Sequence, residues 1–157
     1  MDLTDTAEVR FMRGYSCSQS VFSALAERWN ISPDVSLRIA AGFGGGLARS
    51  AGTCGCVSRA VMAIGLAQHG ISPEVNRSEK AKTYEVCRRF MRAFEERNGS
   101  TLCSELLGCN ISTPEGLAQA RREGLFQSRC TKLVRDTVEI VRGMLPDAYG
   151  PGQGSAE

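Results

Sequence analysis

Residues 42–65 read GFGGGLARSAGTCGCVSRAVMAIG, and this stretch decides how the rest of the chain is interpreted. Its second half predicts a helix that starts near Cys54, because Thr53 is an N-cap residue and Val57, Val61 and Ile64 repeat with helical spacing. A thiol at a helix N-terminus meets free N–H groups and the positive end of the helix dipole, and both favour the thiolate. The first half is dense in glycine, so its backbone can adopt positive φ and approach a bulky inorganic or phosphate group closely.

The composition and charge of the whole chain limit which classes of function are possible. The chain has 157 residues and a formal net charge of +2, with basic and acidic residues interleaved, which gives no electrostatic case for nucleic acid or an anionic membrane. The first residues, MDLTDTAE, are acidic and polar, unlike a signal peptide, and no apolar run approaches the ~20 residues of a membrane span. We therefore expect one soluble, cytoplasmic domain without membrane insertion.

Cysteine and histidine usage point to sulfur chemistry. Seven cysteines, an odd number, argue against a disulfide framework and for thiol, metal or cluster chemistry. His69 is the single histidine, so a two-histidine zinc or iron site cannot be built from one chain. Because His69 precedes Gly70 at a predicted helix end, we expect it to be a solvated residue that compensates the helix dipole.

Helical periodicity and capping residues predict an all-α fold, a compact bundle of about six to eight helices. No segment alternates apolar and polar residues as a strand does. The expected helices cover residues 4–13, 16–29, 33–40, 54–69, 78–98, 101–107, 113–123 and 128–145. They form one domain over residues 1–145, and the Gly- and Pro-rich residues 146–157 predict a disordered tail.

Four cysteines share a position in this scheme. Each lies in the first turn of a different predicted helix: Cys17, Cys54, Cys103 and Cys130. If these helix ends converge, they supply four thiolates and several backbone donors to a metal or iron–sulfur centre. Their spacing matches no compact C-x-x-C motif, so the alternative that the four never meet stays open.

The same residues carry a resemblance to a family. Four segments, YSCSQSV (15–21), GFGGG (42–46), TCG (53–55) and CSELLG (103–108), together with the stretch 112–134, resemble the small redox-active proteins called the C_GCAxxG_C_C family. The likeness covers roughly residues 14–145, and it places the four cysteines of the family on Cys17, Cys54, Cys103 and Cys130. A related domain resembles part of the split-Soret cytochromes, where an iron–sulfur centre accompanies haem. Since this chain has no C-x-x-C-H site, the resemblance implies the cluster and not the haem.

The chain departs from the family pattern at two positions. Cys56 replaces an alanine and Arg59 replaces a glycine, so the site has gained a ligand and a counter-charge, or Cys56 is one more small buried residue. Two further cysteines lie outside the family set. Cys109 follows a glycine and is expected to be an exposed loop thiol, which with Cys56 could form a resolving pair. Cys87 lies in a helical stripe with Tyr84, Met91 and Phe94 and is expected to be a buried apolar residue.

Three hypotheses follow. In the first, an electron-transfer protein holds an iron–sulfur cluster on Cys17, Cys54, Cys103 and Cys130, with Cys56 as an added ligand. N–H groups of the loop and helix start, at Gly44, Gly45, Gly46 and Gly55, would bind the cofactor, and a redox partner protein would exchange electrons. In the second, the same thiolates bind or traffic zinc or another soft metal.

In the third, a cofactor-free thiol oxidoreductase uses a low-pKa Cys54 with Cys56 or Cys109. The pattern favours an electron-transfer or metal-binding protein over a stand-alone catalyst. Phosphate binding by the loop is disfavoured, because G-x-x-x-x-G-K-[ST] is absent and no strand precedes it. Seven thiols per chain would also allow two chains to share a metal centre across a two-fold axis, so a homodimer remains an alternative.

Overall fold

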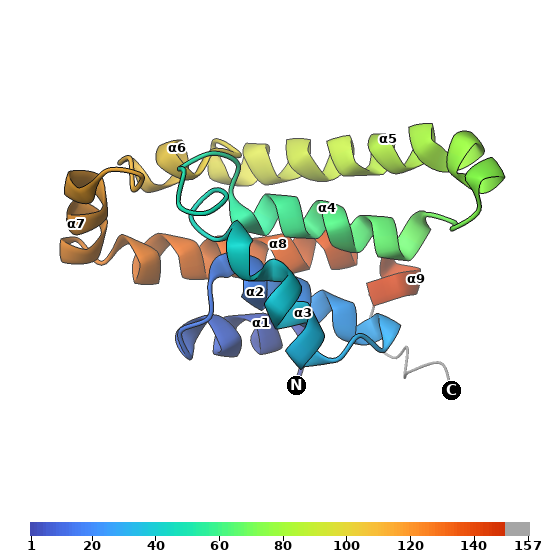
Figure 1. The fold of residues 1–157 in the computed structure, drawn as a ribbon, viewed down its shortest axis with the longest axis horizontal. Helices are drawn as coiled ribbons and strands as arrows, with labels where there is room; N and C mark the ends of the chain where they lie inside the picture. Colours follow the sequence, from blue (N-terminus) through green and yellow to red (C-terminus); the bar gives the residue numbers. More distant parts are fainter. Residues whose placement is uncertain (150–157) are drawn as a thin grey trace.

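The computed structural model describes residues 1–149, which form helices joined by short connections (Figure 1). The α-helices are α1 (Leu3–Met12), α2 (Cys17–Ala26), α3 (Pro33–Ala40), α4 (Gly55–Gln68), α5 (Pro73–Asn98), α6 (Cys103–Leu107), α7 (Pro114–Arg122), α8 (Thr131–Met144) and α9 (Pro146–Tyr149). Within this part of the chain there is no strand, only an isolated antiparallel bridge between Thr53 and Leu102. The predicted all-α class is confirmed. None of the described helices combines the length and the apolar character that crossing a membrane requires.

The long helices α4 and α5 lie side by side, and α8 packs against both. Helices α1 to α3 lie on the side of α4 that faces away from α5 (Figure 1). Helix α2 is central, since it packs against α1, α3, α4 and α8. Its inward residues, Val21 and Leu25, have no exposed surface and join Phe90 and Phe94 of α5 in the main apolar core. This arrangement brings the start of α2 next to the start of α4.

Several helices start where capping residues predict. Ser32 and Thr113 accept a hydrogen bond from a first-turn N–H, and a proline follows each of them. The expected start of α5 at Ser78 is wrong, because Ser72 caps the helix and Pro73 begins it. The expected cap of α4 is also displaced: Cys54 is the N-cap residue, and Thr53 instead pairs with Leu102.

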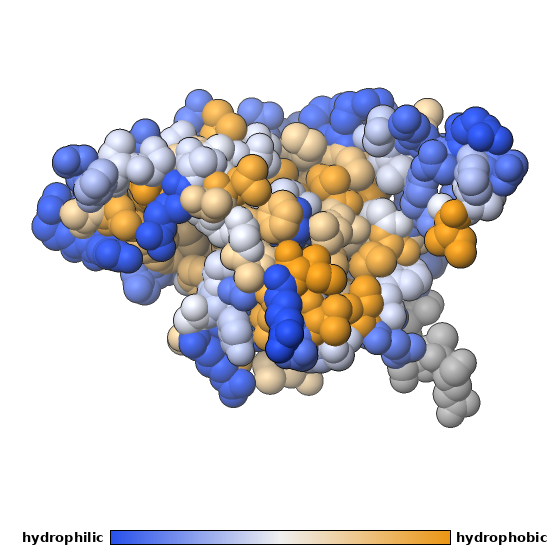
Figure 2. Space-filling view, in the orientation of Figure 1, coloured by the Kyte–Doolittle hydropathy of each residue, from blue (hydrophilic) through white to orange (hydrophobic). Residues whose placement is uncertain are grey.

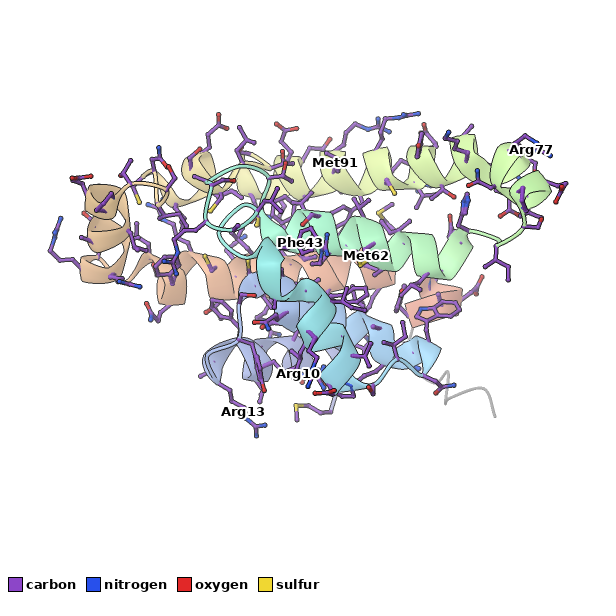
Figure 3. The ribbon with its side chains drawn as sticks, in the orientation of Figure 1. Arg10, Arg13, Phe43, Met62, Arg77 and Met91 are labelled. Atoms are coloured by element: carbon purple, nitrogen blue, oxygen red, sulfur yellow. The ribbon has the colours of Figure 1, made fainter. Side chains whose placement is uncertain are left out.

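The amphipathic stripe of α5 differs from the predicted one at a single position. Cys87 is buried in the main core, as expected, whereas Tyr84 is 52% exposed and Phe90 occupies the inward face. Helix α3 leaves Val35 and Ile39 about half exposed, and Figure 2 shows an apolar patch on the face of the molecule where Figure 3 labels Met62 of α4. Part of the apolar face of α3 is therefore in contact with solvent.

The helical region continues past the expected domain end at residue 145. Residues 146–149 form α9, and Tyr149 is fully buried, where its hydroxyl donates to the carbonyl of Ala63 (2.8 Å) and accepts from Nε1 of Trp29 (3.1 Å). These contacts dock the end of the helical region onto α4. The remaining eight positions of the expected tail, 150–157, lie outside the described residues.

Candidate metal and redox site

The start of α2 fixes the first cysteine of the site. Ser16 and Gln19 form a capping box, in which the Ser16 side chain accepts from the N–H of Gln19 and the Gln19 side chain accepts from the N–H of Ser16 (3.0 Å). Cys17 is the first helical residue and is half-buried. Its predicted place at a helix N-terminus is confirmed.

The glycine-rich loop that follows α3 is wound in a left-handed sense. Gly45 and Gly46 have φ of 65° and 72°, and the non-glycine residues Leu47, Ala48 and Arg49 continue with positive φ. Hydrogen bonds from the Ala48 N–H to the Gly42 carbonyl (2.8 Å) and from the Gly52 N–H to the Gly46 carbonyl (3.0 Å) close the loop on itself. Each non-glycine residue in this conformation costs roughly 1 kcal/mol.

Two glycines allow close contact between this loop and the cysteines. A Cβ at Gly55 would lie 3.0 Å from Sγ of Cys17 and 2.8 Å from the Phe43 carbonyl oxygen, and a Cβ at Gly44 would lie 2.9 Å from Cβ of Ser16. Real Cβ atoms almost never approach other atoms this closely, so both positions require glycine. The loop and the start of α4 therefore pack directly on Cys17.

A short antiparallel pairing joins two of the predicted ligands. The N–H of Cys54 donates to the Thr101 carbonyl (2.8 Å), and the N–H of Cys103 donates to the Gly52 carbonyl (2.7 Å). Cys54 occupies the N-cap position of α4, and Cys103, the first residue of α6, lies immediately beside it. Backbone hydrogen bonds therefore hold together residues that are distant in sequence, and helical periodicity does not predict such bonds.

Three thiols form a tight group at this point. The Sγ atoms of Cys17, Cys54 and Cys56 all lie within 4.8 Å of one another, from the starts of α2 and α4. Ligands of a tetrahedral metal with bonds of about 2.3 Å are separated by about 3.8 Å, so small side-chain shifts would bring these sulfurs to one ion. The group could hold a metal, and Cys56 belongs to it.

The electrostatics of the group single out Cys17. Hydrogen bonds from the thiols of Cys54 and Cys56, with further donation from the N–H groups of Gly45 and Ser18, hold the pKa of Cys17 well below its usual value. The pKa of Cys54 is raised, first because its thiol hydrogen-bonds Cys17 and then by burial. The prediction of a low-pKa Cys54 is therefore wrong: its helix-terminal position is outweighed by a neighbouring thiolate.

The other two predicted ligands face the same centre from a different wall. Cys103 and Cys130 line one cavity with Cys17 and Cys54, and both are buried. Burial, reinforced by the negative charge of Cys17, raises the pKa of Cys103 to about 11 and that of Cys130 to about 12. Neither belongs to the close three-thiol group among the described residues.

The position of Cys130 differs from the expected helix start. It is the last residue of a π-helical segment, Phe126–Cys130, that runs without a break into α8. The helical region begins before the expected start at Ser128, so Cys130 lies inside a continuous helix rather than at its N-terminus. A π-helical turn is common at functional sites, and here it directs Cys130 toward the cavity.

The cavity has a volume of about 580 Å³. One wall is the glycine loop with the starts of α2 and α4, and we call it the loop wall. The other wall is formed by α6, α7, Phe126–Cys130 and α8, and we call it the helix wall. The helix wall is mostly apolar and contributes Leu106, Ile111, Leu117 and Phe126 to the lining of the cavity.

Arg59 and Cys109 are not part of the three-thiol group. Arg59 is only 4% exposed, its guanidinium lies 3.4 Å from the ring centroid of Phe43, and its Nε and Nη1 have no hydrogen-bond partner among the described residues. Phe43 lies where the chain passes from α3 into the loop (Figure 3). Cys109 is half-buried and does not join the three-thiol group, and all seven cysteines, each within residues 1–149, are free thiols.

Fold and site define a class: an all-helical, cysteine-rich protein with a thiol cluster that could hold a metal. A family model described as "Putative redox-active protein (C_GCAxxG_C_C)" matches residues 15–144, and the chain belongs to this family. It is also similar to a protein of Archaeoglobus fulgidus described as "Uncharacterized protein", with 29% identity over 138 residues, 84% of this chain and 85% of that protein. No solved structure matches.

Sequence reasoning identified the four family cysteines and weighed Cys56 as a fifth. It did not identify the helix wall, or Arg49 and Arg121, which also line the cavity. For the three-thiol group, the only indication in the sequence was the C-x-C spacing that places Cys56 close to Cys54. Nothing in the sequence signals the wall, because it is assembled from four separate segments.

Proposed function

We propose that the protein is an electron-transfer protein with an iron–sulfur cluster in the cavity, held by Cys17 and Cys54 of the loop wall and Cys103 and Cys130 of the helix wall. The supporting observation is that buried thiols face one cavity from both walls. A single ion at the three-thiol group reaches ligands only about 2.3 Å away. A cluster contains several metal atoms and can therefore engage thiolates on both walls.

The residues around the thiols suit such a centre. When bound, an iron–sulfur cluster supplies one-electron transfer at a potential set by hydrogen bonds to its sulfurs, by charge and by burial. The N–H groups of Gly45 and Ser18 donate to Cys17, and the close packing at Gly55 leaves no room for a side chain between the start of α4 and Cys17. Cys56 adds a fifth thiol beside Cys17 and Cys54, available as an alternative ligand or as a hydrogen-bond donor.

A second candidate is a site for a single soft ion such as zinc. It is favoured by the proximity of the three thiols, whose Sγ atoms lie within 4.8 Å of one another, so that small side-chain shifts would bring them to three corners of a tetrahedron. The two candidates differ in the residues they need. The cluster requires Cys103 and Cys130, whereas the single ion requires Cys56.

The test is metal analysis of protein purified without oxygen, with iron, sulfide and zinc measured per chain together with the visible spectrum. We expect a brown protein with iron and sulfide. Cys103→Ser and Cys130→Ser should each lower the iron and sulfide content at least about fivefold, because a lost ligand exposes the cluster. Cys87→Ser is the matched control, since Cys87 is a buried cysteine that does not line the cavity.

Each alternative outcome has a distinct meaning. If Cys103→Ser and Cys130→Ser keep a full complement of zinc while Cys17→Ser, Cys54→Ser and Cys56→Ser lose it, the single-ion site replaces the cluster. If none of these variants changes the metal content, neither candidate is correct. A separate redox partner protein would exchange electrons with the cluster, and sizing of the loaded protein tests the homodimer.

A further inference from the structure

The helix wall provides an apolar surface that the thiol chemistry does not use. Leu106, Ile111, Leu117 and Phe126 contribute this surface from α6, α7 and the segments beside them. The cavity volume of about 580 Å³ falls in the range of small-molecule sites, about 300–1,000 Å³. Such sites combine an apolar lining with a few convergent polar groups, so the polar groups of this cavity indicate what it would bind.

Apart from the thiolate of Cys17 on the loop wall, the charged side chains that line the cavity are basic. Arg49 from the glycine loop and Arg121 from α7 line it, and both residues are exposed to solvent, which places them at its opening. Figure 1 shows that the loop and α7 lie toward the same end of the molecule. Over residues 1–149, no aspartate or glutamate lines the cavity.

These two arginines also differ from most others in the protein. Arg10, Arg135 and Arg142 each pair with a carboxylate, as do several arginines along α5. Within the described part of the chain, neither Arg49 nor Arg121 makes an ion pair or donates a side-chain hydrogen bond. Two guanidinium groups at the opening of an apolar cavity are therefore available for an anion that enters it.

We propose that this cavity binds a small organic anion, with its carboxylate at Arg49 and Arg121 and its apolar body against the helix wall. The role of this cavity as a substrate site for the redox centre rests on the proposed function, whereas binding of the anion is measured independently. A concave site with its charges at the opening selects a small molecule over the surface of a protein or a nucleic acid. The apolar body would lie within reach of Cys103 and Cys130 on the same wall.

The experiment is calorimetric titration of the full chain with straight-chain carboxylates from acetate to octanoate, and with 1-octanol. Protein is used both metal-free under reductant and with its centre reconstituted. We expect affinity to rise about threefold per methylene as the apolar wall is covered, and octanoate to bind more tightly than octanol. Arg121→Gln and Arg49→Gln should each weaken octanoate binding about fivefold, and the double variant more, with octanol unaffected.

Arg122→Gln is the matched control, because Arg122 is the exposed neighbour of Arg121 on α7 and does not line the cavity. All the substituted residues are exposed, so folding is preserved. The inference is overturned if octanoate shows no saturable binding in either form, if octanol binds as tightly, or if Arg121→Gln behaves like Arg122→Gln. Octanoate binding to a protein that holds no cluster would refute the proposed function alone, and a protein that holds its cluster but binds no carboxylate in either form would refute this inference alone.

Discussion

The two walls of the cavity differ at one cysteine: Cys17 on the loop wall has a lowered pKa, whereas the pKa values of its neighbour Cys54 and of both cysteines on the helix wall are raised. On the loop wall, Cys17 receives hydrogen bonds from two thiols and two backbone N–H groups, and its pKa is lowered. On the helix wall, Cys103 and Cys130 are buried among apolar side chains, and their pKa values are raised to about 11 and about 12. The loop wall is therefore prepared to hold a negative charge, whereas thiolates form on the helix wall only when a metal replaces their protons.

The largest expected effect comes from disturbing the loop wall. Gly55→Ala should lower the free energy of unfolding by about 3 kcal/mol and remove most of the bound metal, because the new Cβ would meet backbone at 2.8 Å and Sγ of Cys17 at 3.0 Å. Urea unfolding and metal analysis measure the two effects. Gly65→Ala in the same helix is the control: a Cβ there meets nothing within 4 Å, so it should stabilise the protein by up to about 1 kcal/mol. Equal behaviour of the two variants would refute the close packing.

The helix wall can be tested through pH. The pKa of Cys130 rises from 9.0 to about 12 on folding. Between these values the unfolded chain releases this proton and the folded chain keeps it, so stability that is complete below about pH 9 is lost as pH rises. Between about pH 8 and about pH 11, the metal-free protein should lose about 2 kcal/mol more stability than Cys130→Ala. Parallel pH profiles would show that burial does not hold this thiol neutral.

The contrast between the walls also predicts thiol reactivity. In the metal-free folded protein near neutral pH, iodoacetamide should modify Cys17 at least about tenfold faster than Cys130, because Cys17 is half-buried with a lowered pKa and Cys130 is buried with a raised one. Mass spectrometry of digested protein gives the order. In urea the two should react alike, and a faster Cys130 in the folded state would reverse the assignment.

The smallest effect concerns the left-handed loop. Ala48 has φ of 48°, so Ala48→Gly should stabilise the protein by about 0.5–1 kcal/mol through relief of strain. The matched control is Ala81→Gly, at an exposed position inside α5. It should lower the stability of the protein by about 1 kcal/mol. Thermal unfolding distinguishes the signs. If both variants are destabilised, the left-handed winding of the loop contributes no strain.

Local rules predicted much of the helical framework. Ser16, Ser32 and Thr113 cap the helices that begin beside them, since a side-chain oxygen and a first-turn N–H are only three residues apart. The starts of α5 and of the helical region before Cys130 were misplaced. Helix α5 uses the earlier cap at Ser72, and the segment Phe126–Cys130 begins after Leu125 without a side-chain cap, so no capping signal marks its start.

The sequence by itself determined the all-α class, most helix boundaries and which cysteines to consider, because capping and helical periodicity act over a few residues. Tertiary structure decided which thiols meet. The backbone pairing of residues 52–54 with 101–103 and the contact of Gly55 with Cys17 group Cys17, Cys54 and Cys56 and leave Cys103 and Cys130 on the other wall. It also decided which cysteine carries the lowered pKa, since that depends on hydrogen bonds and burial contributed by segments far apart in the chain.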